Sequence, residues 1–199
     1  SAPVPFVAGS TVLFSAETPV LGRELWRTDG TRAGTALVAD LRARGSSAPS
    51  SFFVLGTSPL RVLFAADDGA NGEELWITDA TTAGTRLVAD LRAGSASSPR
   101  PLAALPGARA LVEARVDAAT SACFASDGTA AGTAPLAPAA SGAASSFPSR
   151  FTGDHPGASA WFQANDGLRG YEPFRSDGTN AGTFSLGDLR PGAAGSAPD

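Results

Sequence analysis

One short stretch constrains this chain more than any other feature, because it recurs at a fixed spacing. Residues 22–35 read GRELWRTDGTRAGT, and residues 72–85 read GEELWITDATTAGT. Altered versions of the same stretch follow at residues 123–133 and 171–183. A period near 50 residues is typical of propellers, solenoids and other repeat arrays. The sequence therefore predicts four copies of one small structural unit.

An aspartate marks the same position in each copy, with spacings of 50, 48 and 50 residues. These anchors are Asp29, Asp79, Asp127 and Asp177. The repeats are predicted to occupy about residues 1–46, 47–96, 97–144 and 145–199 of a single repeat domain. Both ends of the sequence fall at the same phase of the repeat, which is the pattern expected of a piece of a longer array.

Each period contains four short apolar or alternating segments, and the second copy shows them most plainly. They are residues 51–55, 61–66, 74–78 and 86–91. Gly, Pro, Asn and Asp fill the intervening turns, and no window keeps a helical spacing of apolar residues. The repeat is predicted to be a four-stranded antiparallel meander. First strands of the other copies are expected near residues 4–8, 102–105 and 149–152.

A lone meander has two apolar faces and too small a core, so neighbouring sheets must stack. Closing such a stack gives an all-β propeller, either a four-bladed ring or half of an eight-bladed one. The alternative is an open β-solenoid, whose strands pair in parallel between coils. The two prolines in residues 134–138 suit only an edge strand, and the fourth strand is the outer edge of a propeller blade.

The third strand of each repeat carries a recurrent acid and a recurrent aromatic residue. Because side chains alternate along a strand, Glu24, Trp26 and Thr28 share one face. The aromatic positions are Trp26, Trp76, Phe124 and Phe174. They are predicted to pack between neighbouring sheets, where each ring buries a large apolar area. A role in stacking on sugars would require these rings to be exposed.

The conserved pattern around the anchor aspartate predicts a compact turn rather than a catalytic group. The carboxylate of Asp29 can accept backbone N–H groups, and the hydroxyls of Thr31 and Thr35 can tie the loop. Gly34 is expected to supply a positive φ. The equivalent glycines are Gly84, Gly132 and Gly182.

A set of charges also repeats, and it is predicted to form hydrogen bonds and ion pairs between strands or between sheets. In the first copy it comprises Glu24, Asp40 and Arg42. The equivalents are Glu74, Asp90 and Arg92, and then Glu172, Asp188 and Arg190. The third copy lacks all three charges, which supports a coupled set.

The loops between second and third strands hold clustered carboxylate and amide oxygens, the ligands that Ca²⁺ prefers. The candidate ligands are Asp67, Asp68, Asn71, Asn165 and Asp166. Their spacing does not match an EF-hand loop, and solvated turns use the same residue types. Calcium is thus one hypothesis for these loops, and no cofactor is the other.

No set of residues in the sequence has the spacing of a catalytic or zinc site. His155 is the single histidine and lies in a loop-like segment, and Cys123 is the single cysteine and is expected to be buried. The net charge of −4 gives no basic face for nucleic acid. No apolar run is long enough to insert in a membrane.

Residues 24–35 and 74–85 resemble the bacterial ELWxTDGTxxGT repeat family, found in tandem in predicted secreted or surface proteins, notably of myxobacteria. The resemblance covers nearly the whole chain and implies a propeller-like array outside the cytoplasm, with no settled activity. The function expected is a non-enzymatic extracellular or cell-surface scaffold that binds an unidentified protein or glycan. The alternatives are a glycan-binding lectin and a hydrolase with its site at the propeller axis. Self-association to complete a larger ring is a further expectation.

Overall fold

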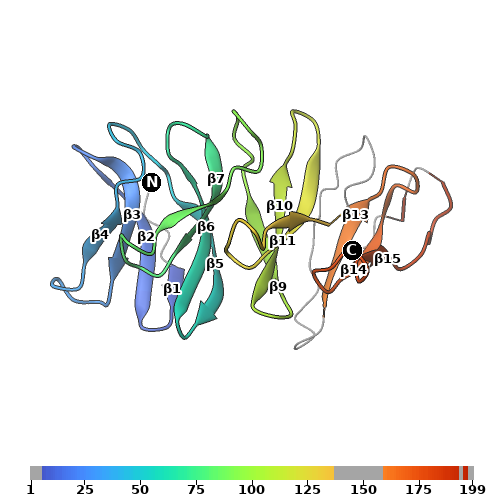
Figure 1. Ribbon diagram of the computed structural model, residues 1–199, viewed down its shortest axis with the longest axis horizontal. Helices are drawn as coiled ribbons and strands as arrows, with labels where there is room; N and C mark the ends of the chain where they lie inside the picture. The colour runs from blue at the N-terminus through green and yellow to red at the C-terminus, as the bar shows by residue number, and fades with distance from the viewer. Residues whose placement is uncertain (1–5, 137–158, 193–194, 197–199) are drawn as a thin grey trace. The chain divides into compact units, whose positions relative to one another are not determined.

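A computed structural model describes residues 6–136, 159–192 and 195–196 of the chain, and these form strands and turns without any helix (Figure 1). The chain divides into two compact units, residues 1–100 and 101–199, which are described separately. The predicted all-β class is confirmed.

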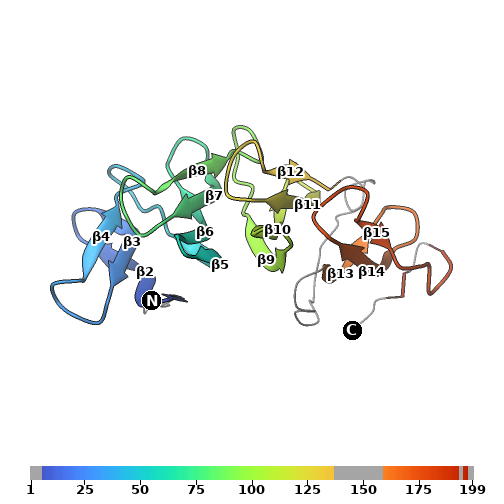
Figure 2. The same ribbon diagram turned by 60° about the horizontal axis from the view of Figure 1, so that its bottom comes forward.

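The first unit contains two sheets of four strands. Sheet 1 consists of β1 (Phe6–Ala8), β2 (Thr11–Thr18), β3 (Gly22–Thr28) and β4 (Ala36–Ala39). Sheet 2 consists of β5 (Ser50–Thr57), β6 (Leu60–Asp67), β7 (Glu73–Thr78) and β8 (Arg86–Ala89). In each sheet the strands lie in chain order, so the predicted meander is confirmed (Figure 2).

The second unit also contains two sheets. Sheet 3 consists of β9 (Arg100–Leu105), β10 (Arg109–Arg115), β11 (Ser121–Ser126) and β12 (Ala134–Pro135). Sheet 4 has three described strands, β13 (Ala160–Asn165), β14 (Tyr171–Ser176) and β15 (Phe184–Ser185). The predicted strand at residues 149–152 lies outside the described residues. The brevity of β12, an edge strand, agrees with its prolines.

Every strand pair whose register the structure gives is antiparallel, unlike the coils of a parallel solenoid. The register sets two faces on every sheet. Phe14 lies directly opposite Trp26, and Phe64 lies opposite Trp76. We call this side, which carries Trp26, Trp76, Phe124 or Phe174, the aromatic face of each sheet. The other side, which carries Leu13 and Leu25 in sheet 1, is the reverse face.

In the first unit, the reverse face of sheet 1 packs on the aromatic face of sheet 2. One buried cluster joins Leu13 and Leu25 of sheet 1 to Phe64 and Trp76 of sheet 2. Phe6 of β1 stacks on Phe52 of β5 with ring centroids 5.7 Å apart. Burial of these side chains is the main term that holds the two sheets together.

The second unit repeats this arrangement with different side chains. Leu111 and Cys123 on the reverse face of sheet 3 share one buried cluster with Phe162 and Phe174 on the aromatic face of sheet 4. The rings of Phe162 and Phe174 stack at 5.9 Å. Stacking of a reverse face on the next aromatic face is therefore the packing rule within both units.

Candidate functional site

The anchor aspartate of each repeat closes the turn between the third and fourth strands. In sheet 1 the Oδ1 atom of Asp29 accepts hydrogen bonds from the backbone N–H and the hydroxyl of Thr31, at 2.9 and 2.7 Å. The Thr31 hydroxyl in turn accepts the N–H of Gly34 at 2.9 Å. These bonds hold the pKa of Asp29 below its usual value, the Thr31 hydroxyl first.

The same hydrogen bonds recur at Asp79, Asp127 and Asp177. The expected positive φ at Gly34 is wrong, because Gly30 is the residue with the left-handed backbone, at φ 90°. Position 34 instead requires glycine because no side chain fits there: an added Cβ would lie 2.0 Å from the Asp29 carboxylate. The same holds in the other repeats, where a Cβ added at Gly84, Gly132 or Gly182 would lie 2.0–2.1 Å from the aspartate of its own turn.

The recurrent glutamate secures the linker to the next repeat. Glu24 is fully buried. Its carboxylate accepts the backbone N–H groups of Leu41 and Ser47, each at 2.9 Å, and the Ser47 hydroxyl at 2.5 Å. The carbonyl of Ser47 accepts the N–H of Asp67 in sheet 2 at 2.9 Å. Glu24 thus acts through Ser47 on the junction between two sheets.

Glu74 and Glu172 make equivalent bonds. Glu74 accepts the N–H of Leu91 and the N–H and hydroxyl of Ser97, at 2.6–2.8 Å. Glu172 accepts the N–H of Leu189 and the N–H and hydroxyl of Ser196, at 2.6–3.2 Å. Burial raises the pKa of Glu74 against these hydrogen bonds. The third repeat has Ala122 at this position.

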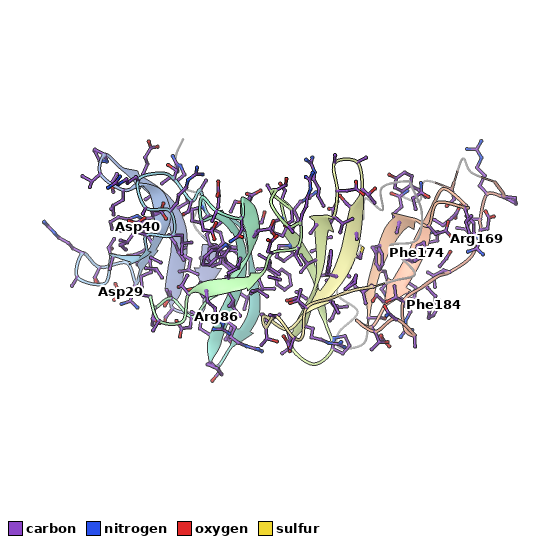
Figure 3. All side chains as sticks on the ribbon, turned by 45° about the horizontal axis from the view of Figure 1, so that its top comes forward. Asp29, Asp40, Arg86, Arg169, Phe174 and Phe184 are labelled. Carbon is purple, nitrogen blue, oxygen red and sulfur yellow. The ribbon has the colours of Figure 1, made fainter. Side chains whose placement is uncertain are left out.

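The repeated arginines Arg42 and Arg92 bond to groups other than the glutamates. Arg42 forms an ion pair with Asp67, which connects sheet 1 to sheet 2 as predicted for this set. Asp40 is exposed on the loop after β4, at the opposite end of that strand from Asp29 (Figure 3). Arg92 donates to the carbonyl of Ala96 at 3.3 Å. The set therefore acts through separate local contacts, with the glutamates bonded to backbone rather than to arginine.

Three of the four aromatic positions are enclosed by protein. Trp76, Phe124 and Phe174 are buried, and the indole N–H of Trp76 donates to the carbonyl of Ala66 at 3.1 Å. Trp26 is only partly buried. Rings in the enclosed positions have no free surface on which a sugar could stack.

The loops between the second and third strands, here called the central hairpins, are the variable part of the repeat. They span residues 19–21, 68–72, 116–120 and 166–170 and read PVL, DGANG, VDAAT and DGLRG. Three carry an exposed apolar side chain: Val20 is 84% exposed, Leu168 is 77% exposed and Val116 is also exposed. A rigid framework with variable, partly apolar loops is the usual arrangement of a binding surface.

The predicted calcium ligands lie in or beside the central hairpins, where protein donors occupy them. Asp67 accepts the N–H of Gly69 at 2.6 Å besides its ion pair. Asp68 accepts the N–H groups of Ala70 and Asn71, both at 2.8 Å, and the Asn71 side-chain amide at 2.7 Å. These are the bonds of ordinary Asx turns. Calcium binding here stays a prediction.

The equivalent hairpin of sheet 4 is closed in the same way. Asn165 accepts the N–H of Gly167 at 2.8 Å. Asp166 accepts the N–H groups of Leu168 and Arg169, both at 2.9 Å, and pairs with the Arg169 guanidinium at 3.2 Å. Throughout the described residues, no three acidic, histidine or cysteine side chains gather as a metal site would require.

The remaining reactive side chains do not form a cluster in the described residues. Burial raises the pKa of the Cys123 thiol to about 12, with the nearby Glu113 adding to the effect. His155, the single histidine, lies outside the described residues. In the part of the chain that the structure describes, no helix has the length and apolar character to cross a membrane.

Compared with known proteins, the sequence matches no family model, and no curated protein matches it. The likeness to the ELWxTDGTxxGT repeats therefore stays an expectation from the motif.

Proposed function

We propose that this chain is a non-enzymatic, extracellular or cell-surface repeat protein of the β-propeller kind that binds a protein or glycan through its central hairpins. The supporting observation is that the recurrent acids of the repeat stabilise the fold, whereas its central hairpins do not share a sequence. The recurrent acids have structural partners, since Glu24 bonds to the linker and Asp29 to its own turn. The central hairpins, in contrast, differ in every repeat, and three of the four present an apolar side chain to solvent.

The lectin alternative has less support than the sequence suggested. Its motivation was the repeated aromatic residue together with the polar loops, and in three repeats that ring is buried. A glycan ligand remains within the proposal only through contacts with the hairpins. The exposed side chains Val20 and Leu168 suit an apolar patch on a protein at least as well as a sugar.

A binding screen tests the proposal. The labelled chain is applied to a glycan array and to an array of extracellular proteins, beside a Val20→Asp/Leu168→Asp variant. We expect at least one ligand whose binding the double variant loses about tenfold or more. Val7→Asp is the matched control, because Val7 is also exposed but lies on β1, away from the hairpins.

Two results would overturn the proposal. The first is binding that the hairpin substitutions leave unchanged. The second is turnover of chromogenic esters, glycosides or phosphate esters that an Asp68→Asn substitution abolishes, since a carboxylate needed for chemistry would make the chain an enzyme.

A further inference from the structure

The aromatic face of sheet 1 is more exposed than those of sheets 2 and 4, on each of which the other sheet of its own unit packs. In sheet 2 the opposite pair Phe64 and Trp76 is buried, and Phe64 is 0% exposed. The equivalent pair of sheet 1, Phe14 and Trp26, is partly exposed. Val12 beside this pair is also partly exposed, although its equivalent in sheet 2 is fully buried. The residue types are the same, so the difference lies in what packs on them.

A further contact is missing at the turn beside this face. The turn glycine Gly30 has no atom within 4 Å of an added Cβ. At the equivalent turn of sheet 4, Gly178 lies 3.0 Å from Leu105 of sheet 3 on the same measure. The open space beside Gly30 is that of a turn without a neighbouring sheet packed on it.

The reverse face of sheet 4 shows the complementary exposure. Residues equivalent in register on the fourth strands are Val38, Val88, Leu136 and Leu186. The first three are 3%, 4% and 2% exposed, and Leu186 is 42% exposed. Beside it, Phe184, labelled in Figure 3, is also exposed. The Arg175 guanidinium lies over its ring, 5.6 Å from the ring centre.

One arginine on this face has a counterpart that already bridges two sheets. Arg175 follows Phe174 as Arg27 follows Trp26. Arg27 lies on the reverse face of sheet 1 and donates to the carbonyl of Ala80, in the turn of sheet 2, at 3.1 Å. The residue equivalent to Ala80 in sheet 1 is Gly30. Arg175 therefore has the position from which it would reach the carbonyl of Gly30 on a sheet 1 packed against it.

From these matches we propose that the reverse face of sheet 4 docks on the aromatic face of sheet 1 of a second copy of this chain, with Arg175 donating to the carbonyl of Gly30. The contact repeats the packing of reverse face on aromatic face seen within both units. Since two different surfaces meet, the contact is head to tail, and it builds a ring or an open filament according to its rotation. This inference is independent of the proposed ligand binding.

Sedimentation velocity and light scattering over a range of protein concentrations test the proposal. We expect complexes of two or more copies, with a blue shift of tryptophan emission on association, because Trp26 and Trp161 both lie on the docking faces. Leu186→Arg should weaken association at least about tenfold, since it places an unpaired charge in an apolar contact. Leu168→Arg is the matched control, because it alters an exposed leucine of the same sheet outside the face.

A mixing experiment distinguishes head-to-tail docking from a symmetric contact. Val12→Asp impairs the sheet 1 surface and leaves sheet 4 intact, whereas Leu186→Arg does the reverse. Each variant alone should be monomeric at concentrations where a mixture of the two forms a single species of two copies. Far-ultraviolet circular dichroism and the unfolding midpoint verify that each variant is folded.

Three outcomes would overturn the proposal. The unaltered chain could remain monomeric at every concentration. Leu186→Arg could assemble as well as the Leu168→Arg control, which would mean that the sheet 4 surface is not involved. Finally, the mixture of folded variants could fail to associate although the unaltered chain does.

Discussion

Replacing the buried glutamate of sheet 2 by alanine should destabilise the first unit by more than any exposed substitution nearby. Glu74→Ala removes the acceptor of the Leu91 N–H and one of the two acceptors of the Ser97 N–H, which keeps a bond to the Glu73 carbonyl at 3.1 Å. A buried donor left without a partner costs about 1–3 kcal/mol. One such donor, the weakened bonding of Ser97 and the vacated space amount to about 2–4 kcal/mol.

The charge of Glu74 reduces this figure. Burial raises the pKa of its carboxyl, so the ionised group is itself disfavoured by its surroundings, and removing it recovers part of that cost. We therefore expect a net loss of about 2 kcal/mol. Ser97→Ala leaves both N–H bonds in place and should cost about 1 kcal/mol.

Urea denaturation followed by tryptophan fluorescence measures the loss, because Trp76 lies two residues away on the same face. The matched control is Glu73→Ala, on the same strand, whose carboxylate takes part in one long hydrogen bond with Ser50 at 3.4 Å. That variant should change stability by less than about 0.5 kcal/mol. Equal stabilities of Glu74→Ala and Glu73→Ala would refute the role assigned to the buried carboxylate.

Three other substitutions or treatments follow from the same contacts. Gly34→Ala should cost about 2 kcal/mol or more in urea unfolding, because its Cβ would lie 2.0 Å from Asp29, and Gly34→Ala/Asp29→Ala should cost less than the sum of the two single changes. Because the pKa of Asp29 is lowered by folding, its ionised carboxylate stabilises the fold above the unfolded pKa, and this stabilisation is lost as pH falls through the folded pKa. Unfolding midpoints below about pH 4 should therefore depend less on pH in Asp29→Asn than in the unaltered chain. Cys123, with a pKa raised to about 12, should react with a thiol reagent at neutral pH only in the unfolded chain.

The sheets could be predicted from the sequence because their signals are local. Alternation along the third strand predicts that Trp26 and Glu24 share one face, and the pairing of β3 with β2 confirms it. The Asp29 turn follows likewise from residues a few positions apart. Four copies of each signal made the strand boundaries recoverable even where one copy was degenerate.

The partners of the glutamates could not be predicted, since they lie far along the chain and belong to the backbone. Glu24 bonds to Ser47, 23 residues later, whereas the repeated arginine offered a more obvious charged partner. The linker reaches this carboxylate through an unusual backbone, with positive φ at the following residue, Ala48. No periodicity encodes such a path, and binding loops carry no signal of their ligand in a single sequence.

The bond between Glu24 and Ser47 joins the third strand of one copy to the entry of the next, and Glu74 with Ser97 keeps the same offset of 23 residues. Each of these bonds therefore crosses the boundary between one copy of the repeat and the next. An insertion or deletion of one whole period restores every such link, wherever in the period the break falls. A change of any other length between a glutamate and its serine leaves a buried carboxylate facing the wrong stretch of chain, which gives a physical reason why arrays of this design should grow and shrink by entire units.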